Sequence, residues 1–459
     1  MRQSRSPNRW HTLIPVALAV LLIGAAGERP SLPEAAKRGD KDALRALLKQ
    51  GAKVDAVEGD GTTALHWASY RDDLESADLL ILAGAPVDAA NDLGATPLWA
   101  ASQNGSDAMV RRLLRAGANP NVALIAGETP LMVASRAGNA NVVEQLLAAR
   151  AQANAHGARG QTALMWAVAQ EHPDVVKVLL AHGADVNARS DTYTEVMAVS
   201  PHGLLEYNRP IPHGSDTALL FAARVGDLAS AQLLVAAGAN VNDSDAWGVT
   251  ATVLAAHSGF GEFVEFLLAK GADPNLAAPG FTALHEAIMR RDEKLVTVLL
   301  AHGADPNAPL RTWTPTRRAS NDFYFSPALV GATPFWLAAR VTSPAIMRLL
   351  IERGADPLFV HHADYVNGES YERRKEVTTA LMAALGMGGR VTAWVPPGRA
   401  EREGLTLEAV KLATASGVDV NAADLDGRTA LDAAKGLKYE TVVTFLVEKG
   451  AKPGVSDRK

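Results

Sequence analysis

A few side chains have the types and spacing that catalysis or metal binding would need, but most of the chemistry they suggest can be excluded. The 459 residues contain no cysteine, which removes disulfides, thiolate metal sites, iron–sulfur clusters and cysteine nucleophiles. His285 and Glu286 lack the second histidine, four residues after the first, that a zinc protease helix needs. The chain has neither a Gly-x-Ser-x-Gly elbow nor a phosphate-binding loop. Gly386, Gly388 and Gly389 follow no recognisable strand, which argues against dinucleotide binding.

The cluster with the most metal-ligand character combines His361, His362 and Asp364. Adjacent side chains of an extended segment point to opposite sides, so these two histidines are poor joint ligands unless the segment bends. Completing a site would require His202 or His213 from another part of the chain. We therefore expect no catalytic residue, no cofactor and no bound metal, and we interpret the histidines as surface or interface groups whose titration would make binding pH-dependent.

Composition and charge describe a folded, mildly acidic protein. Hydrophobic residues make up 48% of the chain, the formal charge is -5 and the isoelectric point is near 6.2. This balance provides ample apolar surface for a core, and it gives no overall electrostatic attraction to nucleic acid or to an anionic membrane. We expect no nucleic-acid partner.

The N-terminal segment has the pattern of a secretory signal peptide. Arg2, Arg5 and Arg9 precede the apolar stretch 13–23, and small residues follow it. The stretch is shorter than the ~20 residues of a spanning helix, and Pro15 interrupts it. We expect residues 1–27 to be cleaved and the mature protein to act in the periplasm or as a secreted protein, without stable membrane insertion. Retention of the segment as an anchor is the alternative.

A repeat of 33 residues organises the remaining chain. A tetrapeptide that begins with threonine and leads into a short apolar helix occurs as Thr63-Ala-Leu-His, Thr96-Pro-Leu-Trp, Thr129-Pro-Leu-Met and Thr162-Ala-Leu-Met. A helix stop of the type Gly-Ala-Asp or Gly-Ala-Asn follows, as at Gly117, Gly183 and Gly303. The threonine hydroxyl is expected to cap the first helix, and the glycine suits the left-handed conformation that ends the second. One unit cannot bury its apolar stripe alone, so the pattern predicts a stack.

These residues resemble the ankyrin repeat, in which each unit contains two helices and a hairpin loop. The resemblance implies an all-α solenoid over residues 28–455, followed by a charged tail at 456–459. The unit anchors, eleven in all, are Pro30, Thr63, Thr96, Thr129, Thr162, Thr217, Thr250, Thr282, Thr333, Thr379 and Thr429.

Four insertions interrupt the C-terminal half of the repeat pattern, at about 189–214, 308–332, 359–378 and 386–404. Three fall at hairpin tips, and the fourth separates the two helices of one unit. They contain aromatic, arginine and histidine residues, which are common in binding interfaces. The alternative is that the inserted segments fold back to cover apolar edges of the stack. Candidate partner contacts in the insertions are Tyr207, Arg209, Trp313, Arg317, Arg318, Phe323, Tyr324, His361, His362 and Tyr365.

The resemblance also implies a concave binding face, formed by residues seven and eight positions after each anchor. This row is basic for an acidic protein, so an acidic partner is one hypothesis, and ordinary solvent-exposed arginines are the other. The row consists of Tyr70, Arg71, Gln103, Asn104, Arg136, Gln170, Arg224, His257, Arg290 and Arg340.

We therefore expect a non-catalytic scaffold that binds another protein outside the cytoplasm, through its concave face and its inserted loops. The alternative is an accessory protein, with or without catalytic activity, whose inserted loops build a pocket for a small ligand or a metal.

Overall fold

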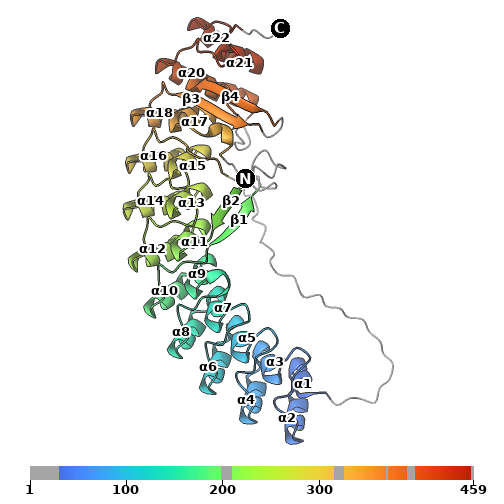
Figure 1. Cartoon of the computed structure of the whole chain (residues 1–459). Helices are drawn as coiled ribbons and strands as arrows, with labels where there is room; N and C mark the ends of the chain where they lie inside the picture. Colours follow the sequence, from blue (N-terminus) through green and yellow to red (C-terminus); the bar gives the residue numbers. More distant parts are fainter. Residues whose placement is uncertain (1–29, 198–208, 315–324, 368–370, 390–397, 456–459) are drawn as a thin grey trace, which may run out of the picture.

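The computed structural model describes residues 30–197, 209–314, 325–367, 371–389 and 398–455. Within these ranges the chain forms 22 α-helices that follow one another as helix pairs. The pairs stack side by side into a long, curved column (Figure 1). The predicted stack of helical repeats is confirmed.

The helices of the N-terminal half are short and regular. They are α1 (Leu32–Arg38), α2 (Lys41–Lys49), α3 (Ala64–Tyr70), α4 (Leu74–Leu82), α5 (Pro97–Gln103), α6 (Asp107–Arg115), α7 (Pro130–Ala137), α8 (Ala140–Ala148), α9 (Ala163–Ala169), α10 (Pro173–Ala181), α11 (Ala218–Val225) and α12 (Leu228–Ala236).

The C-terminal half continues the series and contains one long helix, α20. Its helices are α13 (Ala251–Ser258), α14 (Gly261–Ala269), α15 (Ala283–Met289), α16 (Glu293–Ala301), α17 (Pro334–Arg340), α18 (Pro344–Glu352), α19 (Ala380–Ala384), α20 (Arg399–Ala415), α21 (Ala430–Leu437) and α22 (Glu440–Glu448). Residues 399–404, which we expected in a loop, therefore form the first turns of α20.

Helix boundaries follow the capping chemistry expected from the sequence. The hydroxyls of Thr63, Thr129 and Thr250 each accept a hydrogen bond from the backbone N–H three residues later. At the N-terminal end, Ser31 rather than Pro30 caps α1. The stop glycines adopt the predicted left-handed conformation, with φ of 91° at Gly117. These local interactions fix where each helix begins and ends.

The core runs along the whole column between the two layers of helices. Leucine, valine and alanine side chains such as Leu98, Val143 and Ala167 have no exposed surface. Small side chains let helices of neighbouring pairs approach closely, and each pair buries its apolar face against the next. Among the described helices, the main contacts are within a pair or between neighbouring pairs, so the column behaves as a linear chain of similar interfaces.

A row of asparagines fastens neighbouring pairs at the loops that follow the second helices. Asn275 donates through Nδ2 to the Gly303 carbonyl at 2.9 Å, and its Oδ1 accepts from the Asp305 N–H at 2.7 Å. The same two bonds recur at Asn121, Asn154, Asn187, Asn242, Asn307 and Asn421. We call this row the asparagine ladder. Leu358 occupies the equivalent position between Asn307 and Asn421, so the ladder has a gap there.

Two antiparallel hairpins extend the connections between pairs. The strand β1 (Tyr193–Met197) pairs with β2 (Arg209–His213), and β3 (Val360–Val366) pairs with β4 (Arg373–Thr379). Each forms a separate two-stranded sheet. Figure 1 shows both hairpins on the side of the odd-numbered helices, on the inner side of the curve.

Candidate partner-binding surfaces

The inner side of the column carries the residue row proposed as the concave binding face. Tyr70 is 58% exposed, and Gln103 and Gln170 are also exposed. Tyr70 packs edge-on against Trp67 and Gln170 donates to the Ala169 carbonyl, and all three side chains keep exposed surface. They are available to a partner.

Two arginines of the row form ion pairs with acidic residues that we did not anticipate. Arg136 forms an ion pair with Glu128 at 2.6 Å and lies 5.3 Å from the centre of the Trp166 ring. Arg224 pairs with Asp216 at 2.9 Å and lies over Phe221. Glu128 and Asp216 each directly precede a threonine anchor, which is the signal that would have revealed them. The pairs reduce the net positive charge that the row presents.

Three more members of the row bond to the preceding helix pair. Arg71 donates to the carbonyl of Lys37 at 3.3 Å, and Arg290 donates to that of His257 at 2.7 Å. Asn104 donates to the Tyr70 carbonyl at 2.5 Å. These side chains satisfy carbonyls at the end of a first helix, where no helical donor is available.

His257 lies beside a buried carboxylate of the next pair. Its Nδ1 is 3.0 Å from Oε2 of Glu286, whose side chain is 3% exposed. A carboxylate buried to this degree is stable only with polar or charged partners, and His257 supplies one of them. The histidine is half-buried and reaches the inner surface with its remaining edge.

Arg340 is not a surface contact, contrary to our expectation. Its guanidinium donates to the carbonyls of Gly388 and Gly389, the second at 2.5 Å. Burial lowers the pKa of Arg340 to about 10, which still leaves the side chain charged at neutral pH. The glycine turn that follows α19 folds over the end of α17 and covers part of the arginine, which is half-buried. It is a structural cation.

The inner layer of the β3–β4 hairpin also corrects one proposed contact. His361 is fully buried, with its ring 4.3 Å from that of Trp336 and its Nε2 3.1 Å from the Val330 carbonyl. Burial lowers the pKa of His361 and so favours the neutral ring. His362 is exposed on the opposite face, as expected for adjacent residues of a strand. Tyr365 is half-buried and donates to Glu376 at 2.9 Å.

The second insertion is anchored by an aromatic residue that points inward. Phe325 is 1% exposed and packs 5.3 Å from the Phe281 ring and 6.2 Å from the His285 ring. Trp313 is half-buried at the other end of the insertion. Phe325 and His361 therefore follow the alternative interpretation, in which inserted segments fold back and cover apolar edges of the stack. Five proposed contacts lie outside the described residues: Tyr207, Arg317, Arg318, Phe323 and Tyr324.

The first insertion presents a more open hairpin. Arg209 is exposed at the start of β2, and Tyr193, 44% exposed, stacks on His213 at 5.4 Å. Arg159 from the preceding pair lies 5.4 Å from the Tyr193 ring centre. This arrangement holds an aromatic residue in a fixed position on the surface.

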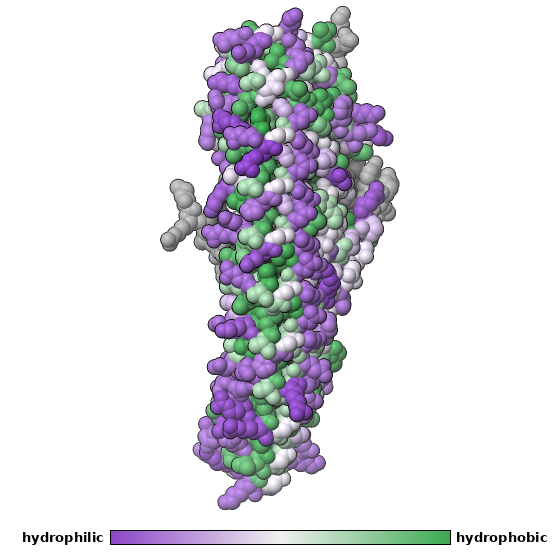
Figure 2. Space-filling model, turned by 90° about the vertical axis from the view of Figure 1, so that its left-hand side faces the viewer, coloured by the Kyte–Doolittle hydropathy of each residue, from purple (hydrophilic) through white to green (hydrophobic). Residues whose placement is uncertain are grey.

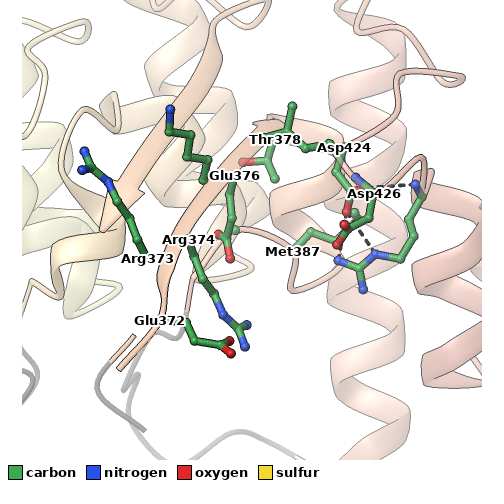
Figure 3. Close-up of a pocket in the computed structure, with 12 residues that line it drawn as sticks. Glu372, Arg373, Arg374, Glu376, Thr378, Met387, Asp424 and Asp426 are labelled. Atoms are coloured by element: carbon green, nitrogen blue, oxygen red, sulfur yellow. Dashed lines mark hydrogen bonds and ion pairs between the residues drawn. The ribbon is translucent and has the colours of Figure 1, made fainter. Parts of the chain in front are cut away.

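A polar groove lies between β4 and the loop Asp424–Arg428, and it was not foreseen from the sequence (Figure 3). Its volume is about 380 Å³. Charged residues of both signs line it, and Arg428 forms an ion pair with Asp424 at 2.9 Å. Glu376 and Thr378 each contribute a buried oxygen that has no hydrogen-bond partner.

The outer side of the column differs in character. Figure 2 shows a band of apolar residues along it, flanked by polar ones. Half-buried side chains at one recurring position of the second helices contribute to this side, among them Val178, Leu233, Phe266 and Leu349. They pack against the core, which explains the continuity of the band.

The described ranges hold no group of three or more His, Asp or Glu side chains placed to bind a metal ion. Among the helices in those same ranges, none has the length and apolar character needed to cross a membrane.

Comparison with known proteins identifies the repeat. The family profile described as "Ankyrin repeats (3 copies)" matches residues 32–124, 98–190 and 215–309, which together make up more than half of the 459 residues. Profiles described as "Ankyrin repeats (many copies)" and "Ankyrin repeat" match 164–235 and 330–362. An ankyrin repeat and KH domain-containing protein of Caenorhabditis briggsae is 30% identical over 253 residues. That match covers 54% of this chain but only 9% of the relative.

Proposed function

The chain belongs to the ankyrin repeat family, and from this premise we propose that it is a non-catalytic scaffold that binds another protein outside the cytoplasm. Ankyrin repeats are generally protein-interaction modules. The N-terminal pattern of arginines followed by an apolar stretch supports action in the periplasm or after secretion. Within the solenoid, the eleven anchors and the four insertions define the finer organisation that we propose.

One observation carries the proposal: the column is fixed internally, and its hairpins lie on the same inner side as the exposed row. Carbonyl contacts, the asparagine ladder and ion pairs such as that between Arg112 and Asp78 hold neighbouring pairs in register. A partner that binds such a surface orders few side chains, which lowers the entropic cost of association. Tyr70, Gln103 and Gln170 on the row and Tyr193 on β1 are the exposed contacts that we propose first.

Affinity capture from an extracytoplasmic fraction tests this function. The bait is the full chain, compared with a variant in which residues 315–324 are replaced by a glycine–serine segment of equal length. Phe325 stays in place because it belongs to the core. The matched control carries the same kind of replacement at 198–208. Specific capture by the full chain supports the proposal, and loss of a partner in one variant locates its site. Absence of any specific partner for the full chain contradicts it.

The sign of the partner's charge is tested separately. Exchanging Glu128 and Arg136, as Glu128→Arg with Arg136→Glu, keeps the local ion pair but reverses its direction. Arg136→Glu alone removes the pair as well. If the partner presents an acidic contact at this position, the exchange weakens binding although stability is retained. Equal binding by the exchanged protein would contradict an acidic contact at this position.

A further inference from the structure

The strand β4 has a free edge. It belongs to a two-stranded sheet in which β3 is its only neighbour among the described strands. A strand edge presents backbone N–H and C=O groups in alternation, and an added strand can pair with them. In an isolated hairpin this edge is usually open to solvent. Here it lies inside the polar groove.

The hairpin register identifies the backbone groups on the free edge of β4. The Asn367 N–H donates to the Glu372 carbonyl at 2.9 Å, and Tyr365 is paired with Arg374 and Ala363 with Glu376. In an antiparallel pair, hydrogen-bonded and non-bonded residue pairs alternate. Arg374, Glu376 and Thr378 therefore direct their backbone groups to β3. Lys375 and Val377 direct theirs to the free edge.

The residues that line the groove show that it follows the edge rather than one face. Glu372, Arg373, Arg374, Lys375 and Glu376 all contribute. Consecutive residues of a strand point to opposite faces, so a cavity over one face would be lined by alternate residues only. The opposite wall is the loop Asp424–Arg428.

At five comparable positions elsewhere, a backbone hydrogen bond joins the tips of neighbouring loops. These bonds run from Asp92 to Asp60, Ile125 to Leu93, Asp191 to Arg159, Ala246 to Gly214 and Arg311 to Gly280, at 2.7 to 2.9 Å. No such bond joins β4 to Asp424–Arg428 in the part of the chain that the structure describes. The groove occupies the place of this missing contact.

Charges on one face of this segment alternate in sign, whereas Arg373 and Lys375 place basic side chains on the other face. Glu372, Arg374 and Glu376 are labelled in Figure 3; Glu372 directly precedes β4, and the other two occupy alternate positions on one face of the strand. Glu376 Oε2 has no hydrogen-bond partner, while its Oε1 accepts from Tyr365. Thr378 is 2% exposed, and its Oγ1 also lacks a partner. A ligand that supplies donors to Glu376 would compensate for this unsatisfied acceptor.

We propose that an extended segment of a partner protein adds to β4 as a third strand, with an acidic residue opposite Arg374 between two basic residues opposite Glu372 and Glu376. Its backbone pairs with Lys375 and Val377. Arg374 and Glu376 point their backbone groups to β3, so the partner's side chains opposite them lie in the closer, non-bonded pairs. This inference rests on the proposed scaffold function and names one site within it.

The test uses the full chain and a capped peptide, acetyl-Thr-Lys-Val-Glu-Val-Lys-Thr-amide. Its charge-inverted counterpart, with Glu and Lys exchanged, is the matched control peptide. Lys375→Pro removes the N–H that faces the groove and, by the register, none that bonds β3. Lys375→Ala removes the same side chain but keeps the N–H. Titration calorimetry measures affinity, and amide hydrogen exchange reports on the strand.

We expect the first peptide to bind the wild type and Lys375→Ala with similar affinity, and to bind Lys375→Pro at least about tenfold more weakly. The charge-inverted peptide binds at least about tenfold more weakly to the wild type. In the free protein the Lys375 and Val377 amides exchange quickly, whereas those of Arg374 and Glu376 are protected. Addition of the first peptide protects Lys375 and Val377.

Equal binding of the two peptides, or equal binding by the Pro and Ala variants, would overturn the proposal. If Lys375→Pro unfolds the hairpin, the wild-type exchange data decide: Lys375 and Val377 must gain protection with the peptide. Loss of self-association in Lys375→Pro would identify a second copy of this chain as the occupant and contradict a partner segment. If Lys375→Pro captures every partner that the wild type captures, the scaffold function is retained and the proposed binding site at β4 is wrong.

Discussion

The asparagine ladder makes a quantitative prediction about the interface between neighbouring pairs. Replacing Asn275 with leucine reproduces at a normal rung what Leu358 does at the gap. The change removes the bond to Gly303 at 2.9 Å and the bond from Asp305 at 2.7 Å. Each exposed hydrogen bond of this kind contributes about 0.5–1 kcal/mol, so we expect the free energy of unfolding to fall by about 1–2 kcal/mol.

Urea unfolding followed by circular dichroism measures this loss, and hydrogen exchange localises it. Because stability in a repeat array is a sum of unit and neighbour terms, faster exchange should appear at the loops around Gly303 and Asp305 and leave α3 and α5 unchanged. Asn141, exposed on α8 with no hydrogen bond to another described side chain, provides the control. Asn141→Leu should change stability by less than about 0.5 kcal/mol.

The reciprocal substitution fills the gap. Leu358 is 56% exposed, and its side chain lies close to Gly417. Leu358→Asn places an amide where the Gly417 carbonyl and the Asp419 N–H correspond to the partners at other rungs, and we expect a gain of about 1 kcal/mol. If Asn275→Leu and Asn141→Leu behave alike, and Leu358→Asn gains nothing, the ladder does not contribute to stability and the reasoning is wrong.

Three further substitutions have defined outcomes. Burial lowers the pKa of His285 to about 4 from an ordinary value of 6.5. The unfolded chain therefore binds a proton below pH 6.5 that the folded protein binds only near pH 4. The free energy of unfolding therefore decreases as the pH is lowered from 6.5 to 4, by at most about 3 kcal/mol. Urea titrations from pH 7 to 4 should show a flatter pH dependence for His285→Asn, and identical slopes would contradict this assignment. Arg340→Met leaves the Gly388 and Gly389 carbonyls without their donor. The melting temperature should therefore drop by an amount equivalent to about 2 kcal/mol. An unchanged melting temperature would show that the glycine turn after α19 does not depend on the Arg340 guanidinium. Arg150 has a φ of 70° at the end of its second helix, where other helix pairs have a glycine. Arg150→Gly should therefore stabilise the fold by up to about 1 kcal/mol in a denaturant titration. A loss of stability would show that the left-handed backbone at Arg150 is not strained.

The fold could be predicted because its determinants are local. The threonine caps, the left-handed glycines and the 33-residue period each act within one or two helices, and all three are readable along the chain. The pattern of His361 and His362 was likewise predictable as two opposite orientations. Which of the two is buried depends on Trp336 in α17, which is distant in the sequence.

The candidate site depends on contacts that no local pattern encodes. Arg340 sits at the row position that is exposed in Arg224, but the glycine turn after α19 covers it. The groove beside β4 requires both a long hairpin and the absence of a contact to the next loop. Such features arise from interrupted repeats, where the neighbour that a residue meets is no longer the one that the period predicts.

The two ends of the second insertion, at Thr314 and Phe325, are joined by hydrogen bonds, and this affects how the inserted sequence can vary. The Thr314 N–H donates to the Phe325 carbonyl at 3.0 Å, the Phe325 N–H donates to the Thr314 hydroxyl at 2.9 Å, and Leu310 is bonded to Ala332 at 2.8 Å. The chain ends that enter and leave residues 315–324 are thus already held together. Doubling the length of a closed loop costs only about 0.6 kcal/mol. This position can accept foreign sequences, by natural variation or by grafting in the laboratory, at little cost to the column that displays them.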